Sequence, residues 1–167
     1  GTDNEQLLND PMYLGWRHPR ISGKEYDDMV ERVVLAIQRK LPQAYLHWED
    51  FGRENARRNL ERYHQQMCTF NDDMQGTGAV TLVALLSAIT RTKVPLTEQR
   101  IVIVGAGTAG TGIADQLCAA MRREGLSQQE ALSRFYLVGR HGLLHQAMPE
   151  LTAFQKPYAR SDLAETG

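Results

Sequence analysis

The sequence predicts an α/β fold with parallel-sheet elements, because helical segments alternate with short apolar strands along the chain. The clearest strand is residues 100–104, whose β-branched run is typical of a parallel strand covered on both faces. An amphipathic helix is predicted from the capping box at residues 22–25 to just before Pro42. Residues 75–89 are apolar on all sides and predict a buried helix.

The other elements complete the alternation of strands and helices. Short strands are predicted at residues 44–48 and 67–70, with a polar helix at residues 53–65 between them. After residue 104 a helix runs to about Arg123, followed by a short helical insertion and a strand at residues 135–138. Since one helix separates each pair of strands, right-handed crossovers would make the paired strands parallel.

Composition excludes several classes of function. The chain has 167 residues and a formal net charge of -1, so nothing points to nucleic acid or to an anionic membrane surface. The longest apolar stretch, residues 79–89, is too short to span a bilayer. Cys68 and Cys118 have no metal-binding spacing, which favours two free thiols in a reducing cytoplasm over a disulfide or a metal role.

Acidic pairs follow two successive predicted strands, Glu49-Asp50 after the first and Asp72-Asp73 after the second. Parallel strands deliver their carboxyl ends to one sheet edge, where open α/β folds bind ligands. Carboxylates gathered there repel one another unless a cation neutralises them, and a hard ion such as Mg²⁺ or Mn²⁺ prefers oxygen ligands. The alternative is that each pair is a solvated turn or a helix N-cap, and the residues alone leave both interpretations open.

A glycine-rich motif directly follows the strand at residues 100–104 and opens the next helix. Small residues let the backbone approach a pyrophosphate, and a helix N-terminus supplies free N–H donors. The motif therefore predicts a Rossmann-like βαβ nucleotide-binding unit rather than a tight turn without a ligand. The candidate cofactor-binding residues are Gly105, Gly107, Thr108, Ala109 and Gly110.

The ribose-reading position lies at the end of the following strand, where an acidic residue would bind the ribose hydroxyls of NAD. The sequence has Gly139 there, followed by Arg140 and His141. The missing carboxylate and the two potential cations favour tolerance of the 2′-phosphate of NADP, whereas a solvated turn is the alternative. The preference between NAD and NADP stays open.

Several further segments stand out beside the acidic pairs and the glycine-rich motif. They are GTDN and LLNDP near the start, WEDF at residues 48–51, FNDDMQGT at residues 70–77, GAGTAGTGIA at residues 105–114 and GLL at residues 142–144. Together these segments resemble the malic enzymes, with the character of the bacterial NAD-linked branch. The resemblance runs from Gly1 to about Phe154, so we expect a central part of a longer protein with a fold incomplete at both ends.

The resemblance implies roles for individual residues. Glu49, Asp50 and Asp73 would hold the divalent metal; Asp73 would also lie beside the nicotinamide, and Asp72 would orient a catalytic lysine. That lysine, a tyrosine acid and a substrate-binding arginine lie upstream in the family, and asparagine contacts lie downstream, so none is assigned here. Residues 1–70 would end a substrate and metal domain, and residues 71–167 would begin the NAD(P)-binding domain.

The implied reaction is oxidation of L-malate at C2 by NAD or NADP, loss of CO₂ from the oxaloacetate formed, and protonation of enolpyruvate to pyruvate. Mn²⁺ or Mg²⁺ supplies Lewis-acid chemistry. We expect a homo-oligomeric, cytoplasmic protein without nucleic-acid or membrane partners. Two alternatives stay open: a non-catalytic remnant that binds dinucleotide or a partner chain, and a metal-free two-domain dehydrogenase.

Overall fold

The computed structural model describes residues 1–162, apart from the side chain of Arg53. Backbone packing divides the chain into two compact units, Gly1–Ala44 and Tyr45–Gly167. Both acidic pairs and the glycine turn lie in the second unit, so the geometry that positions the candidate site belongs to one compact body. Within the part of the chain described, no helix is both long and apolar enough to cross a membrane.

The first unit contains two helices, α1 (Glu5–Asn9) and α2 (Gly23–Lys40). The predicted amphipathic helix is confirmed as α2, but the predicted capping box is wrong, because the Ser22 side chain makes no cap hydrogen bond. Gly23 has φ 58°, in the left-handed region, so the residue after Ser22 does not have the helical backbone that a capping box assumes.

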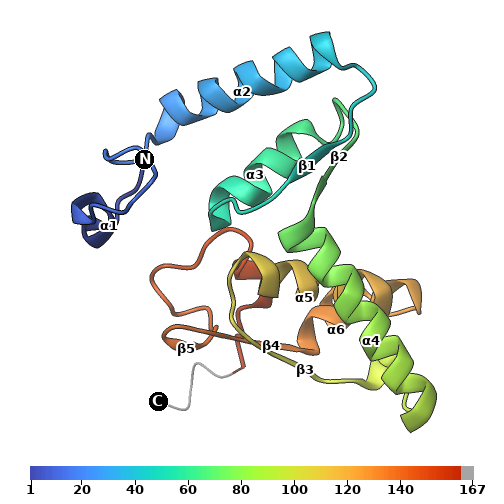
Figure 1. The fold of residues 1–167 in the computed structure, drawn as a ribbon. Coiled ribbons are helices and arrows are strands. Elements are labelled where there is room, and N and C mark those ends of the chain that lie inside the picture. The colour runs from blue at the N-terminus through green and yellow to red at the C-terminus, as the bar shows by residue number, and fades with distance from the viewer. Residues whose placement is uncertain (163–167) are drawn as a thin grey trace. The chain divides into compact units, whose positions relative to one another are not determined.

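The second unit opens with a small parallel βαβ unit (Figure 1). It consists of β1 (Leu46–Trp48), α3 (Arg53–Tyr63) and β2 (Thr69–Asn71). The register pairs Leu46 with Thr69 and Trp48 with Asn71, so the two strands end side by side. The predicted elements and their parallel pairing are confirmed, although the strands are shorter than predicted.

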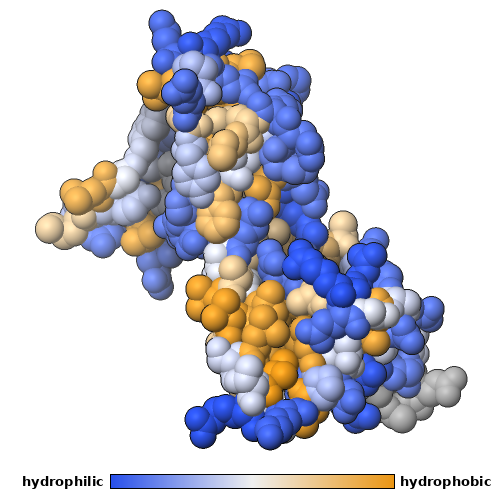
Figure 2. Space-filling model, turned by 90° about the vertical axis from the view of Figure 1, so that its right-hand side faces the viewer, coloured by the Kyte–Doolittle hydropathy of each residue, from blue (hydrophilic) through white to orange (hydrophobic). Residues whose placement is uncertain are grey.

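A π-helix, η1 (Asp72–Gly76), joins β2 to helix α4 (Thr77–Thr92). The prediction that this apolar helix is buried is wrong for the described residues, in which Val80 is 71% and Val83 is 63% exposed. Figure 2 shows hydrophobic side chains gathered on a face of the molecule turned toward the viewer. Helix α4 packs against α5 on one side, and this packing covers only part of its apolar surface.

A second βαβ unit follows, formed by β3 (Ile101–Val104), α5 (Thr108–Arg123) and β4 (Phe135–Gly139). Strands β3 and β4 are parallel as predicted, and β5 (Gly142–Leu143) adds an antiparallel edge to give the order β3-β4-β5. The main core lies between α5 and this sheet and includes Leu117, Met121, Phe135 and Leu137. Coverage of β3 on both faces was wrongly predicted, because Val102 and Val104 are exposed.

The remaining elements surround this core. Helix α6 (Gln128–Ser133) begins with a capping box in which Ser127 and Glu130 exchange hydrogen bonds. Short 3₁₀ turns form at η2 (Leu96–Glu98), before β3, and at η3 (Lys156–Tyr158), after β5. Tyr158, in η3, is buried. Residues 163–167, which the sequence assigns to the nucleotide domain, lie outside the described residues.

Candidate functional site

The two acidic pairs lie together at the carboxyl ends of β1 and β2. Carboxylate oxygens of Glu49, Asp50 and Asp73 all lie within 4.8 Å of one another. The backbone N–H group of Asp50 donates a hydrogen bond to Oδ2 of Asp73 at 3.0 Å. The arrangement follows from the register, because Trp48 and Asn71, the last residues of the two strands, are paired.

Local backbone geometry brings the acidic side chains to this edge. Asp50 has φ 58°, a left-handed conformation that ends β1 abruptly and that aspartate tolerates better than most residues. On the neighbouring strand, the fully buried Asn71 caps η1 by accepting a hydrogen bond from the Met74 N–H group at 3.0 Å. Asp72 and Asp73 therefore occupy the first turn of η1, where the helix dipole favours negative charge.

The donor chemistry of this cluster fits a hard divalent cation. Glu49, Asp50 and Asp73 each offer carboxylate oxygens, the ligand atoms that Mg²⁺ and Mn²⁺ prefer. Glu49 and Asp50 are exposed and Asp73 is half-buried, so an ion could enter from solvent and keep part of its water shell. The residues present are thus compatible with a divalent metal, which would offset the repulsion among the carboxylates.

His47, which belongs to none of the sequence motifs, is a neighbour of the cluster. Its Nε2 lies 3.0 Å from Oε2 of Glu49, and His47, Glu49 and Asp72 form a second group whose ligand atoms lie within 4.8 Å. The alternation of side chains in a strand puts residues two apart on the same face, and this spacing relates His47 to Glu49. The two-residue spacing of His47 and Glu49 is therefore the sequence feature that could have identified His47 as a neighbour of the acidic cluster.

The glycine turn lies where the sequence predicts it, between β3 and α5. Gly105 has φ 118°, which only glycine adopts readily. A side chain at Gly110 would overlap the carbonyl oxygen of Gly105, so the first turn of the helix lies directly against the end of the strand. Thr108, Ala109 and Gly110 form the first turn of α5, whose free backbone N–H groups are the kind of donor that binds anions.

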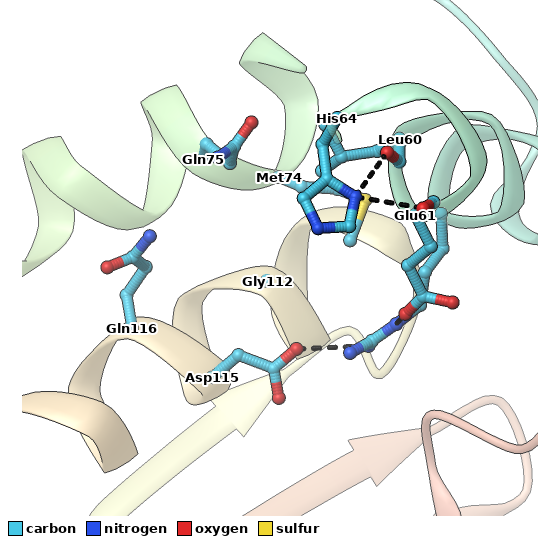
Figure 3. A pocket seen from close by; sticks show the side chains of 9 residues that line it. Leu60, Glu61, His64, Met74, Gln75, Gly112, Asp115 and Gln116 are labelled. Atoms are coloured by element: carbon cyan, nitrogen blue, oxygen red, sulfur yellow. Dashed lines mark hydrogen bonds and ion pairs between the residues drawn. The ribbon is translucent and has the colours of Figure 1, made fainter. Parts of the chain in front are cut away.

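Helix α5 also contacts the segment that carries the acidic cluster. A Cβ atom on Gly112 would lie 2.8 Å from the Cα atom of Met74, the residue that follows Asp73 (Figure 3). Gly112 thus lets α5 approach η1 closely. The same close-up shows Asp115 further along α5. Asp115 forms an ion pair with Arg57 of α3, with Oδ2 and Nη1 3.0 Å apart. The helix behind the glycine turn and the acidic segment therefore form one packed arrangement.

The predicted ribose-reading position lies in a tight hairpin. Gly139 ends β4 and pairs with Gly142, which begins β5, so Arg140 and His141 form the two-residue connection. Gly142, directly after this connection, has φ 103°, a backbone conformation that favours glycine. Arg140 and His141 are both exposed, and no acidic residue occupies the hairpin.

Two protein-family patterns match the chain. The malic enzyme N-terminal domain matches residues 1–64. The malic enzyme NAD-binding domain matches residues 74–166. The acidic pair after β1 falls in the first match, and the glycine turn falls in the second.

Curated relatives are similar over nearly the whole chain. NAD-dependent malic enzyme 3 of Bacillus subtilis is 55% identical over 161 residues, which are 96% of this chain and 28% of the relative. The NAD-dependent malic enzyme of Pseudomonas syringae pv. syringae is 48% identical over 100% of this chain and 30% of its own length. The chain therefore spans less than a third of these relatives.

Solved structures share the fold. The NAD-dependent malic enzyme of Thermotoga maritima superposes with a TM-score of 0.66 at 24% identity, covering 86% of this chain and 36% of the other. The Entamoeba histolytica malic enzyme superposes with a TM-score of 0.64 at 26% identity, covering 81% and 27%.

Proposed function

The chain belongs to the malic enzyme family, and from this premise we propose that it is part of an enzyme that converts L-malate to pyruvate and CO₂ with reduction of NAD. The observation that carries the proposal is the convergence of Glu49, Asp50 and Asp73 at one sheet edge. The NAD dependence named for the relatives supports the choice of cofactor.

We propose that Glu49, Asp50 and Asp73 hold Mn²⁺ or Mg²⁺. A metal bound there supplies Lewis-acid chemistry to an oxygen-bearing substrate. The chain's own contribution is to fix the carboxylates before the ion arrives: the 3.0 Å hydrogen bond from the Asp50 N–H group to Asp73 orients one ligand relative to the next. Such preorganisation reduces the conformational entropy lost on binding.

Two further roles follow for the acidic segment. Asp73 would lie beside the nicotinamide end of the cofactor as well as binding the metal. Asp72 would act as a positioning residue that orients the catalytic lysine. By the family resemblance, that lysine and the tyrosine that acts as the acid would lie in another part of the complete protein. The close approach of α5 to η1 at Gly112 and Met74 supports a short path from cofactor to metal.

Gly105, Gly107, Thr108, Ala109 and Gly110 would bind the pyrophosphate of NAD through backbone N–H groups at the start of α5. Gly139 and Arg140 would lie near the adenosine ribose. The exposed Arg140 leaves room for the additional phosphate of NADP as a weaker alternative cofactor.

The boundary between a substrate and metal part, residues 1–70, and a nucleotide part, residues 71–167, is proposed near Asn71. We further propose a homo-oligomeric, cytoplasmic enzyme. The free state of Cys68 and Cys118 is consistent with a reducing compartment.

The experiment is a steady-state assay with malate, Mn²⁺ and either NAD⁺ or NADP⁺. The complete protein is expected to form pyruvate and NADH in a 1:1 ratio, with loss of activity on removal of the metal by a chelator and recovery on its return. Asp73→Asn, which alters a proposed metal ligand, is expected to lose most of the activity, and Asp28→Asn on α2 is the matched control with unchanged activity. A complete protein that binds NAD⁺ but turns over no malate would instead support a non-catalytic dinucleotide-binding remnant, and metal-independent activity would support another dehydrogenase.

A further inference from the structure

A buried glutamine contacts the glycine turn from a distant part of the chain. Gln155 is 8% exposed, and its Nε2 donates a hydrogen bond to the carbonyl oxygen of Ala106 at 2.7 Å. Ala106 is the second residue of the turn and is itself buried. The two residues are 49 positions apart, so the contact depends on the tertiary fold.

The orientation of the Gln155 amide is fixed at both ends. Its Oε1 accepts a hydrogen bond from the Thr152 N–H group at 3.1 Å, while the Gln155 N–H group donates to the Thr152 carbonyl at 3.0 Å. Only this orientation of the Gln155 amide gives the Thr152 N–H group an acceptor and, at the same time, the Ala106 carbonyl a donor. The donor therefore points at the turn without an alternative rotamer of equal hydrogen bonding.

A second hydrogen bond ties the same segment to the helix after the turn. The hydroxyl of Tyr158, which is 4% exposed, donates to Oδ1 of Asp115 on α5 at 2.7 Å. The Tyr158 ring lies edge-on to Phe135 in β4, with centroids 5.5 Å apart. Residues 152–158 thus hold the turn at one point and the helix at another, and the contact with β4 anchors them to the sheet.

The bond to Ala106 also sets the direction of a potential ligand donor. Ala106 C=O and Gly107 N–H belong to one planar trans peptide unit, in which the two groups point in opposite directions. When Gln155 holds the carbonyl, the Gly107 N–H group faces away from Gln155. Gly107 is the residue directly before α5, where backbone donors serve anions.

We propose that Gln155 is a positioning residue for dinucleotide binding: it fixes the Ala106–Gly107 peptide so that the Gly107 N–H group is presented to the cofactor pyrophosphate. The inference rests on the proposed function, since it assigns the turn to NAD. Without the Gln155 donor the peptide unit can rotate, and the buried carbonyl loses its partner.

The test compares Gln155→Glu and Gln155→Met with the exposed Gln129→Glu on α6 as a charge-matched control. Glutamate keeps the acceptor for Thr152 but replaces the donor with an oxygen, and methionine keeps the length without either group. Titration of the protein with NAD⁺ and with ADP-ribose is expected to show roughly tenfold weaker binding for both Gln155 variants, and unchanged binding for the control.

Four further readouts separate positioning from general destabilisation. Mn²⁺ affinity and the KM of the complete enzyme for malate are expected to stay within twofold of wild type. The KM for NAD⁺ is expected to rise roughly tenfold with little change in kcat. If Gln155→Glu does not fold, Gln155→Met alone is used.

The outcomes distinguish the two claims. NAD⁺ binding equal to wild type in a folded Gln155 variant would overturn the positioning role and leave the proposed function intact. Parallel weakening of NAD⁺ and Mn²⁺ binding would overturn it in favour of a purely structural role. Failure of wild type to bind NAD⁺ would contradict the proposed function itself.

Discussion

The backbone N–H group of Asp50 donates a hydrogen bond to Oδ2 of Asp73 across 23 residues of sequence, at 3.0 Å. This bond joins the ends of two parallel strands and brings together acids that lie far apart in the chain. The left-handed backbone of Asp50 and the Asn71 cap of η1 act on either side of it. The candidate metal site is thus built by main-chain geometry as much as by its carboxylates.

Gly110→Ala is expected to destabilise the protein by about 3 kcal/mol, because a methyl group would overlap the Gly105 carbonyl oxygen and force the helix away from the strand. Urea unfolding measures the effect. Gly52→Ala is the control, since Gly52 has φ -59° and no atom within 4 Å of an added Cβ. That change is expected to cost less than about 1 kcal/mol. Equal costs at the two positions would contradict the close packing described for the turn.

Glu130→Gln is expected to lower stability at neutral pH but not in acid. Hydrogen bonds from the Ser127 side chain and backbone lower the pKa of Glu130 below its ordinary value of 4.5. A lowered folded-state pKa stabilises the protein above the unfolded-state pKa, and this contribution is lost as the pH falls through the folded-state value. Unfolding of wild type and variant at a series of pH values is the measurement, with the exposed Glu150→Gln as control. A difference in stability between wild type and Glu130→Gln that does not change with pH would show that the charge of Glu130 plays no part.

Tyr158→Phe is expected to cost about 1 kcal/mol of stability at neutral pH, because Asp115 loses one hydrogen-bond donor while keeping its ion pair with Arg57. Burial, followed by the charge of Asp115, raises the pKa of Tyr158 above its ordinary value of 10.0. The stabilisation is therefore complete below about pH 10 and decreases as the pH rises further.

Alkaline unfolding of wild type and Tyr158→Phe tests this sign. The difference in stability between the two proteins is expected to narrow above about pH 10. There the phenol of Tyr158 ionises in unfolded wild type but stays neutral in the folded protein, which favours the unfolded state, whereas Tyr158→Phe has no phenol to ionise. A difference that widens with pH would contradict the buried, neutral state of Tyr158.

Much of the fold could be predicted from local sequence patterns. The β-branched run at residues 101–104 and the glycines that follow it specify a strand and a tight turn, and the structure has both. Strands at successive chain positions with one helix between them also predicted the meeting of Glu49 and Asp50 with Asp73. These inferences succeeded because period and topology are encoded over short distances.

Other features depend on partners that local patterns do not reveal. The apolar character of α4 predicted burial, yet burial requires a covering surface, and α5 contacts only one side of the helix among the described residues. Ser22 and Glu25 have the spacing of a capping box, but Ser22 makes no cap hydrogen bond and the following Gly23 has a left-handed backbone. Ser127 and Glu130, with the same spacing, do form a capping box. The role of Gln155 depends on a contact with Ala106, which no periodicity indicates.

Calorimetric titration of Mn²⁺ into wild type and Asp73→Asn tests the central claim most directly. The substitution removes one negative charge but keeps an oxygen that can accept the Asp50 hydrogen bond. The control is Asp28→Asn, which removes a carboxylate that pairs with Lys24 on α2. We predict that Asp73→Asn weakens Mn²⁺ binding by roughly tenfold or more while Asp28→Asn leaves it unchanged. Equal affinities in all three proteins, or no Mn²⁺ binding by wild type, would contradict a metal site at the ends of β1 and β2.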